Sequence, residues 1–163
     1  MERLGKAGAY ICPQAYLFLQ PPAENPSWTD DIQRKKAQST YEGVDHVFKN
    51  AKRYGIKVLW GTDVIGPHAV FEGMVFEWKY RAPYFTNADQ LKQATSLNAE
   101  VLTQTTFLNP YAEGALGVIK EGAYADLLLI DGNPIEDILV MTKPRENFKI
   151  IMKDGKIYKN TLK

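Results

Sequence analysis

The feature that most constrains this fold is the apolar run at residues 56–60, which ends abruptly in Gly61, Thr62 and Asp63. Apart from Lys57, the run is continuously apolar, which is typical of a parallel strand covered on both faces. A segment with helical spacing of apolar residues precedes it, and Gly55 separates the two. Helix, glycine and buried strand in this order are typical of a βαβ unit, so we predict a parallel sheet.

A second strand and a long helix are predicted before this run. The strand at residues 9–12 follows a stop at Gly8 and ends at Pro13, because proline cannot donate a ladder hydrogen bond. The helix begins after a cap at Thr29 and runs to about residue 54. Its inward face is expected to contain the apolar residues at helical spacing, namely Val44, Val47, Phe48 and Ala51.

Two more helices are predicted after the apolar run. Residues 68–80 form the first, and its aromatic side chains are expected to pack in the core. The second begins at Thr86, which makes a capping box with Asp89. Its inward face is expected to contain Leu91, Ala94, Thr95 and Asn98.

The pattern changes after Asn109 and Pro110. Short apolar runs then alternate with Gly and Asp-Gly turns, and residues 148–160 predict a hairpin across Lys153, Asp154 and Gly155. We therefore predict two domains, an α/β part at residues 1–108 and a mostly β part at residues 109–163.

Composition excludes several classes of function. The chain has 163 residues, of which 45% are hydrophobic and 24% are charged, as in a soluble globular protein. The net charge of +1 predicts no nucleic-acid or membrane partner. The single cysteine, Cys12, cannot form an internal disulfide. No apolar stretch resembles a signal peptide, so the expected location is cytoplasmic if Met1 is the true N-terminus and no segment with a signal precedes it.

Asp63 is the candidate functional residue of the first half. Ligands of parallel α/β folds sit at the carboxyl ends of the strands, which is where Asp63 is predicted to lie. A carboxylate there can ligate a divalent metal or accept a proton from water. The structural alternative is that Asp63 caps the next helix or fixes a turn.

Three longer segments carry a family resemblance. They are "QATSLNAEVL" at residues 93–102, "EGALGVIKEGAYADLLLIDGNPIEDI" at 113–138 and "KIIMKDGKIY" at 149–158. With Gly-Thr-Asp before them, they resemble the C-terminal part of the amidohydrolase superfamily, nearest to imidazolonepropionase-like and Xaa-Pro-dipeptidase-like members. The resemblance implies the C-terminal fragment of a metal-dependent (β/α)8 barrel. Residues 1–108 would be its last two βα units and the following helices, and 109–163 the C-terminal part of a small β-sandwich lobe.

The resemblance also implies residue roles. The matching family aspartate binds the metal, takes a proton from the attacking water and delivers it to the leaving amine, which would make Asp63 both catalytic and a metal ligand. The usual metal is zinc, and the substrate would be a small amide or dipeptide-like molecule. His68 would stand at the mouth of the pocket and bind substrate, although a surface or capping histidine is its structural alternative.

Other family ligands are missing from the sequence. The chain has two histidines and no His-x-His pair, and a full barrel takes about 250 residues. Because a catalytic zinc needs about three protein ligands, we expect no fully ligated metal and no hydrolase activity in the isolated chain. Open strand edges predict a homo-oligomer or complementation by a missing N-terminal part. An alternative function is a non-enzymatic module that binds itself or a partner. An unrelated α/β domain is the third reading.

Structural positions are expected for the remaining candidate side chains. His46 should face solvent. Solvent exposure is also expected for Glu72 and Glu77, with orientation of a pocket as the alternative for both. Cys12 is expected to be a buried thiol, with the rim of the pocket as the alternative for it and for Gln14. The acidic pair Glu136 and Asp137 should lie in a surface turn.

Overall fold

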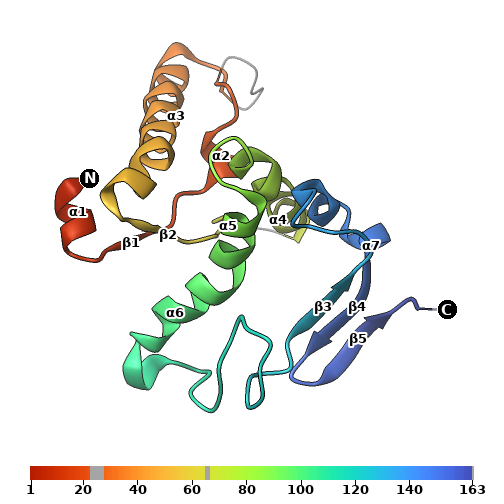
Figure 1. The fold of residues 1–163 in the computed structure, drawn as a ribbon. Helices are drawn as coiled ribbons and strands as arrows, with labels where there is room; N and C mark the ends of the chain where they lie inside the picture. Colours follow the sequence, from red (N-terminus) through yellow and green to blue (C-terminus); the bar gives the residue numbers. More distant parts are fainter. Residues whose placement is uncertain (23–27, 65–66, 163) are drawn as a thin grey trace. The chain divides into compact units, whose positions relative to one another are not determined.

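The computed structural model describes residues 1–22, 28–64 and 67–162, with the side chains of residues 67–70 and 72 excepted (Figure 1). Contacts divide the chain into two compact units, Met1–Tyr84 and Phe85–Lys163. The change of sequence pattern near residue 109 therefore lies within the second unit. Helices that follow Thr86 belong to the same unit as the β region.

The first unit is built around two short parallel strands. Its elements are α1 (Glu2–Lys6), β1 (Tyr10–Ile11), α2 (Ala15–Phe18), α3 (Asp31–Ala51), a 3₁₀ turn (Lys52–Tyr54), β2 (Lys57–Val58) and α4 (Pro67–Arg81). In the register, Tyr10 pairs with Lys57 and Ile11 with Val58. The predicted parallel pairing is confirmed, although the regular strands are shorter than the apolar runs that predicted them.

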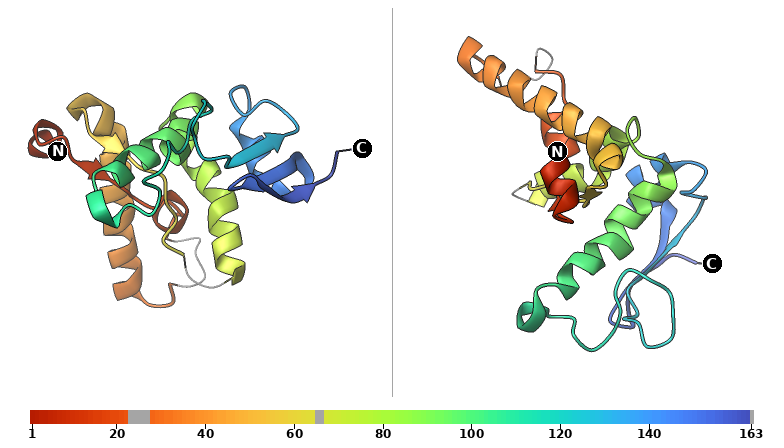
Figure 2. Two further views of the ribbon diagram at one scale, coloured as in Figure 1. Left: turned by 90° about the horizontal axis from the view of Figure 1, so that it is seen from below. Right: turned by 60° about the vertical axis from the view of Figure 1, so that its left-hand side comes forward.

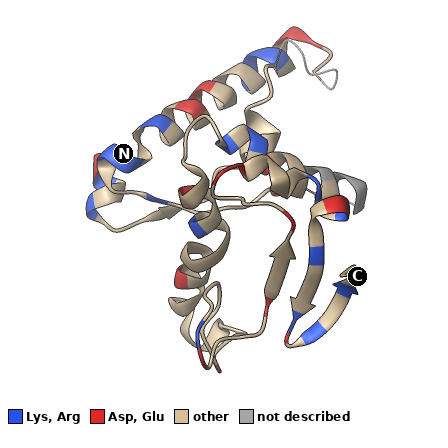
Figure 3. Ribbon diagram, turned by 45° about the vertical axis from the view of Figure 1, so that its right-hand side comes forward, with Lys and Arg blue, Asp and Glu red and all other residues tan. Residues whose placement is uncertain are grey.

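The cap of helix α3 lies one position later than predicted. Asp30, rather than Thr29, accepts a hydrogen bond from the Gln33 amide at 2.8 Å. Gly55 ends the helical stretch with a φ of 64°, as predicted for a left-handed C-terminal residue. Figure 3 shows basic and acidic residues interspersed along the ribbon of α3.

The core of the first unit draws on β2 and three helices. Its buried apolar residues are Ala15, Leu19, Phe48, Ala51, Ile56, Val58, Val75 and Trp78. The indole rings of Trp60 and Trp78 pack with centroids 4.9 Å apart. The prediction that the aromatic residues of α4 pack in the core is right for Trp78 and wrong for Phe71 and Phe76, which are exposed. No helix in the described parts of the chain combines the length and apolarity that a membrane span needs.

The second unit combines a bent helix with an antiparallel sheet (Figures 1 and 2). Its elements are α5 (Asn87–Lys92), a π-helical segment (Gln93–Leu97), α6 (Asn98–Thr103), 3₁₀ turns (Thr106–Leu108 and Ile138–Thr142), α7 (Pro144–Asn147), and strands β3 (Leu127–Ile130), β4 (Phe148–Lys153) and β5 (Lys156–Asn160). The strand order is β3-β4-β5. Thr86 caps α5 by accepting a bond from the Asp89 amide, as predicted.

The buried face of this helix differs from the predicted one, and the helix contains a π-helical segment. Gln90 and Gln93 are buried, whereas Thr95, predicted to face inward, is exposed. A π turn holds more residues than an α turn, so it rotates the later residues away from the α-helical spacing. The loop before the sheet packs on this segment: a Cβ on Gly117 would lie 2.5 Å from the Thr95 carbonyl carbon.

The Gly-x-x-Ala-Asp-Leu stretch at residues 122–127 has a structural role in closing the predicted hairpin. Asp154 and Gly155 form the two-residue turn with φ of 50° and 73°. The Asp126 carboxylate accepts a hydrogen bond from the Asp154 amide at 2.8 Å and forms an ion pair with Lys153 at 3.0 Å. The Gly155 amide donates to the Ala125 carbonyl at 3.0 Å.

Asp126→Ala is expected to lower the free energy of unfolding by about 1–2 kcal/mol at neutral pH, because it removes a charge-assisted hydrogen bond. The Asp154 amide, helped by Lys153, holds the pKa of Asp126 below its usual value. The contribution is therefore complete above the ordinary carboxyl pKa of about 4 and is lost as pH falls through the lowered one. Urea unfolding across this range tests it. Asp131→Ala is the control, since the ion pair of Asp131 with Lys149 is largely exposed. An equal loss in both variants would contradict the prediction.

Candidate functional site

The carboxyl ends of β1 and β2 form the candidate site. The Leu59 amide donates to the Ile11 carbonyl at 2.7 Å, so the parallel pairing continues just past β2. Cys12 and Pro13 then leave β1, and residues 60–63 leave β2. Two chain segments far apart in sequence therefore emerge side by side.

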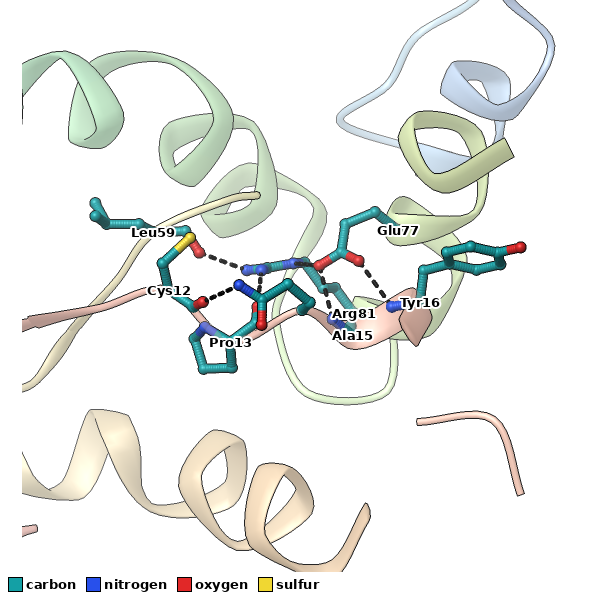
Figure 4. Close-up of polar contacts among 8 residues, drawn as sticks. Cys12, Pro13, Ala15, Tyr16, Leu59, Glu77 and Arg81 are labelled. Carbon is teal, nitrogen blue, oxygen red and sulfur yellow. Dashed lines mark hydrogen bonds and ion pairs between the residues drawn. The ribbon is translucent and has the colours of Figure 1, made fainter. Parts of the chain in front are cut away.

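A buried acid–base pair on α4 holds these ends (Figure 4). Glu77 and Arg81 both have 0% exposure, and Arg81 Nε donates to Glu77 Oε1 at 2.6 Å. The Arg81 guanidinium also donates to the Pro13 carbonyl at 2.7 Å and to the Leu59 carbonyl at 2.9 Å. One side chain thus bridges the exits of both strands.

Glu77 fixes the segment that follows β1. Its carboxylate accepts hydrogen bonds from the backbone amides of Ala15 at 3.0 Å and Tyr16 at 2.7 Å. The prediction that Glu77 faces solvent is wrong. The sequence contained a signal for this burial. Glu77 and Arg81 are four residues apart on a helix that has apolar residues around it, and charged residues that are buried on such a helix have to pair.

Electrostatics of the pair follow from its burial. Desolvation lowers the pKa of Arg81, and the neighbouring Glu77 carboxylate counteracts this. An arginine remains charged even so, since its ordinary pKa lies far above neutral pH. The pair therefore places the guanidinium and its carboxylate partner, both fully buried, against the exits of the two strands.

Asp63 is exposed on the segment after β2. Its φ of 52° lies in the left-handed region, which aspartate tolerates better than most residues. No hydrogen bond or ion pair joins its side chain to another described residue. Gly73 on α4 lets the segment pack closely, because a Cβ there would lie 2.6 Å from Val64 Cγ2.

Cys12 lies beside the same segment. A Cβ on Gly61 would lie 2.8 Å from Cys12 Sγ, so glycine at this position leaves room for the sulfur. The expectation of a buried thiol is wrong, because the residue is exposed. Its sulfur is nonetheless partly desolvated, which raises the pKa of the thiol; Arg81 opposes this shift, and Glu77 and Asp63 add to it.

The other candidate residues lie elsewhere or outside the described side chains. His68 is in the first turn of α4, and its side chain, like that of Glu72, is not described. The substrate-binding role of His68 therefore stays a prediction. His46 is exposed on α3, as predicted. Glu136 and Asp137 are exposed, and Asp137 caps the turn Ile138–Thr142 through the Leu139 amide.

The described residues do not form a metal site by themselves. In the described part of the chain, no three His, Cys, Asp or Glu side chains gather closely enough to hold an ion. A catalytic zinc takes about three protein ligands and a water. Asp63 fits the chemistry of one oxygen ligand, and the described residues around it do not complete a ligand set.

Comparison with known proteins gives a clear structural relationship. No family model matches the sequence, and no curated protein sequence matches it either. The crystal structure of an amidohydrolase superposes on 99% of this chain with a TM-score of 0.80 and 27% identity, covering 37% of its own length. The chain resembles the C-terminal part of an amidohydrolase-superfamily protein.

Two further solved structures agree with this amidohydrolase likeness. A prolidase complexed with N-methylphosphonate-L-proline has a TM-score of 0.74 and 26% identity, with 98% of this chain and 37% of the prolidase covered. Ochratoxinase from A. niger has a TM-score of 0.75 over 95% of this chain and 33% of its own; at 21% identity it supports the fold alone. The chain spans about a third of the length of these solved structures.

Proposed function

We propose that this chain is part of a metal-dependent hydrolase that cleaves an amide or peptide-like C–N bond. In this proposal β1 and β2 are the last two strands of a (β/α)8 barrel. The observation that carries the proposal is the exposed Asp63 carboxylate at the carboxyl end of β2, where parallel α/β folds bind their ligands. The amidohydrolase and prolidase neighbours support the hydrolase class.

Asp63 would act in this reaction as the general base and then as the general acid. Its carboxylate is free to accept a proton from the attacking water and to pass it to the leaving amine. A divalent ion, which is usually zinc in the amidohydrolase superfamily, would supply Lewis acidity toward the amide carbonyl when bound. The ligands that accompany Asp63 have to come from residues beyond those described, and His68 is proposed to contact the substrate.

The first test is the mass of the natural product in the source cell, compared with the 18.4 kDa of this chain. In a longer product, Asp63→Asn is expected to lower kcat/KM for Xaa-Pro dipeptides or N-acyl amino acids at least ~1,000-fold, consistent with the loss of an acid–base group. Asp131→Asn, an exposed carboxylate of the sheet unit, is the matched control. Amidase activity with stoichiometric metal in the pure 163-residue chain would contradict the expected inactivity of this part alone.

A second candidate function is a module that binds a second copy of itself. Strand β3 lies at one edge of its sheet, and its residues Leu127, Leu128 and Leu129 are exposed on both faces. Edge strands with exposed apolar residues pair readily with other chains, and a two-fold contact between identical strands is self-complementary.

This candidate predicts a dimer or larger oligomer in solution, measured by light scattering over a range of concentrations. Leu128→Lys is expected to shift the chain toward monomer, because it places a charge on the sheet edge. Ile119→Lys is the control, since Ile119 is 90% exposed but lies outside the sheet. A wild-type monomer at every concentration would reject self-association.

A further inference from the structure

We propose that Glu77 and Arg81 are positioning residues that lock the carboxyl ends of β1 and β2 together and thereby place the segment that carries Asp63. The functional part of this inference rests on the proposed hydrolase. The structural part concerns only the geometry of this chain.

The bonding of Arg81 is the first step. It donates to the carbonyls of Pro13 and Leu59, which both lie beyond the regular strand pairing. Without a common donor, two chain segments that leave a parallel pair are free to diverge. Arg81 provides that donor, because its planar guanidinium can hold several acceptors at fixed angles.

The bonding of Glu77 is the second step. It accepts the first two amides of α2, so the chain is held immediately after the point where Arg81 holds Pro13. Glu77 also receives Arg81 Nε, which fixes the plane of the guanidinium (Figure 4). The exit of β1 is thus defined on both sides of Gln14.

The energetic argument separates positioning from simple stabilisation. A buried ion pair is weak evidence for stability, because apolar residues of similar volume often replace it without loss. Here four hydrogen bonds join the pair to backbone groups of the two strand exits and α2. An apolar pair could fill the same volume but could not make these bonds.

The connection to Asp63 runs through a short stretch of chain. Leu59, held by Arg81, is four residues before Asp63, and the stretch between them packs against Cys12 through Gly61. Val64, which follows Asp63, packs against Gly73 on the same helix that carries the pair. Helix α4 therefore contacts the chain both before Asp63, at Leu59, and after it, at Val64.

The test is amide hydrogen exchange by NMR on the 163-residue chain. The reporters are the amides of Leu59, Ala15 and Tyr16, with α3 amides as the internal reference for global unfolding. Arg81→Lys keeps the charge but loses the planar fork. We expect its reporters to exchange about 100-fold faster relative to α3, with shifted resonances for Cys12 and Asp63.

Two further variants keep the test decisive. Glu77→Leu with Arg81→Met removes the bonds while filling the volume, and serves if Arg81→Lys does not fold. Glu2→Ala is the matched control, because it removes the 2.7 Å ion pair with Lys6 in the same unit without touching the strand exits or α3. It is expected to change the reporters and α3 equally.

Reporter amides that keep their protection relative to α3 in Arg81→Lys and in the double variant would overturn the proposal. The readout requires neither metal nor substrate. The two proposals can fail separately. If the reporter amides exchange faster but the natural product with Asp63→Asn hydrolyses its substrate normally, the proposed function is rejected and the structural positioning stands.

Discussion

Glu77→Ala is expected to lower the free energy of unfolding of the first unit by about 3–5 kcal/mol, because it leaves the Arg81 charge buried without its carboxylate. It also removes the acceptor of the Ala15 and Tyr16 amides. Tryptophan fluorescence during urea unfolding can measure the effect, since Trp60 and Trp78 both belong to this unit.

An exposed pair of the same geometry provides the control. Lys6 and Glu2 are also four residues apart on a helix, with Nζ and Oε1 at 2.7 Å, but their side chains are 76% and 68% exposed. Glu2→Ala is expected to change the unfolding free energy by less than about 0.5 kcal/mol. If both variants lost the same stability, burial would not be the source of the Glu77 effect.

Gly117→Ala is expected to destabilise the second unit by about 2–4 kcal/mol. Part of the loss is the cost of a side chain at a φ of 68°. The rest is steric, because the new Cβ would lie 2.5 Å from the Thr95 carbonyl carbon and 2.7 Å from the Ser96 nitrogen, which are backbone atoms that cannot turn aside. Hydrogen exchange of the β4 amides is a suitable measurement.

Gly122→Ala separates the two contributions. Gly122 has a φ of 75°, and nothing lies within 4 Å of the position that a Cβ would take there. Its substitution should therefore cost only the backbone strain, about 1–2 kcal/mol. A loss at Gly117 no greater than that at Gly122 would show that the loop does not depend on the close contact with Thr95.

The sequence predicted what depends on local rules. Capping at Thr86, the stop at Gly55 and the hairpin turn at Asp154 and Gly155 follow from backbone preferences, and all three are confirmed. Helix, glycine and apolar run likewise predicted the parallel pairing of β2 with β1. The amidohydrolase resemblance rested on Gly-Thr-Asp in the first unit and on three longer segments of the second.

The rest depended on tertiary contacts that local patterns do not encode. Glu77 appeared solvent-exposed because its acceptor role involves amides more than sixty positions away. Gln90 and Gln93 are buried three positions apart, and the π-helical segment that begins at Gln93 changes the spacing of the residues after it, so that Thr95 is exposed. Asp63 was placed at a strand end by pattern alone, and the role assigned to it and to His68 stays a prediction.

The π-helical segment Gln93–Leu97 has a consequence for how this chain can change length during evolution. Deleting one residue there would restore an ordinary α-helix, but it would turn everything downstream by about 100° about the helix axis. The backbone surface that receives Gly117 would rotate away with it. Insertions and deletions in homologous chains should therefore fall outside this segment, and the number of residues from the cap at Thr86 to Leu97 should stay constant while surface loops vary.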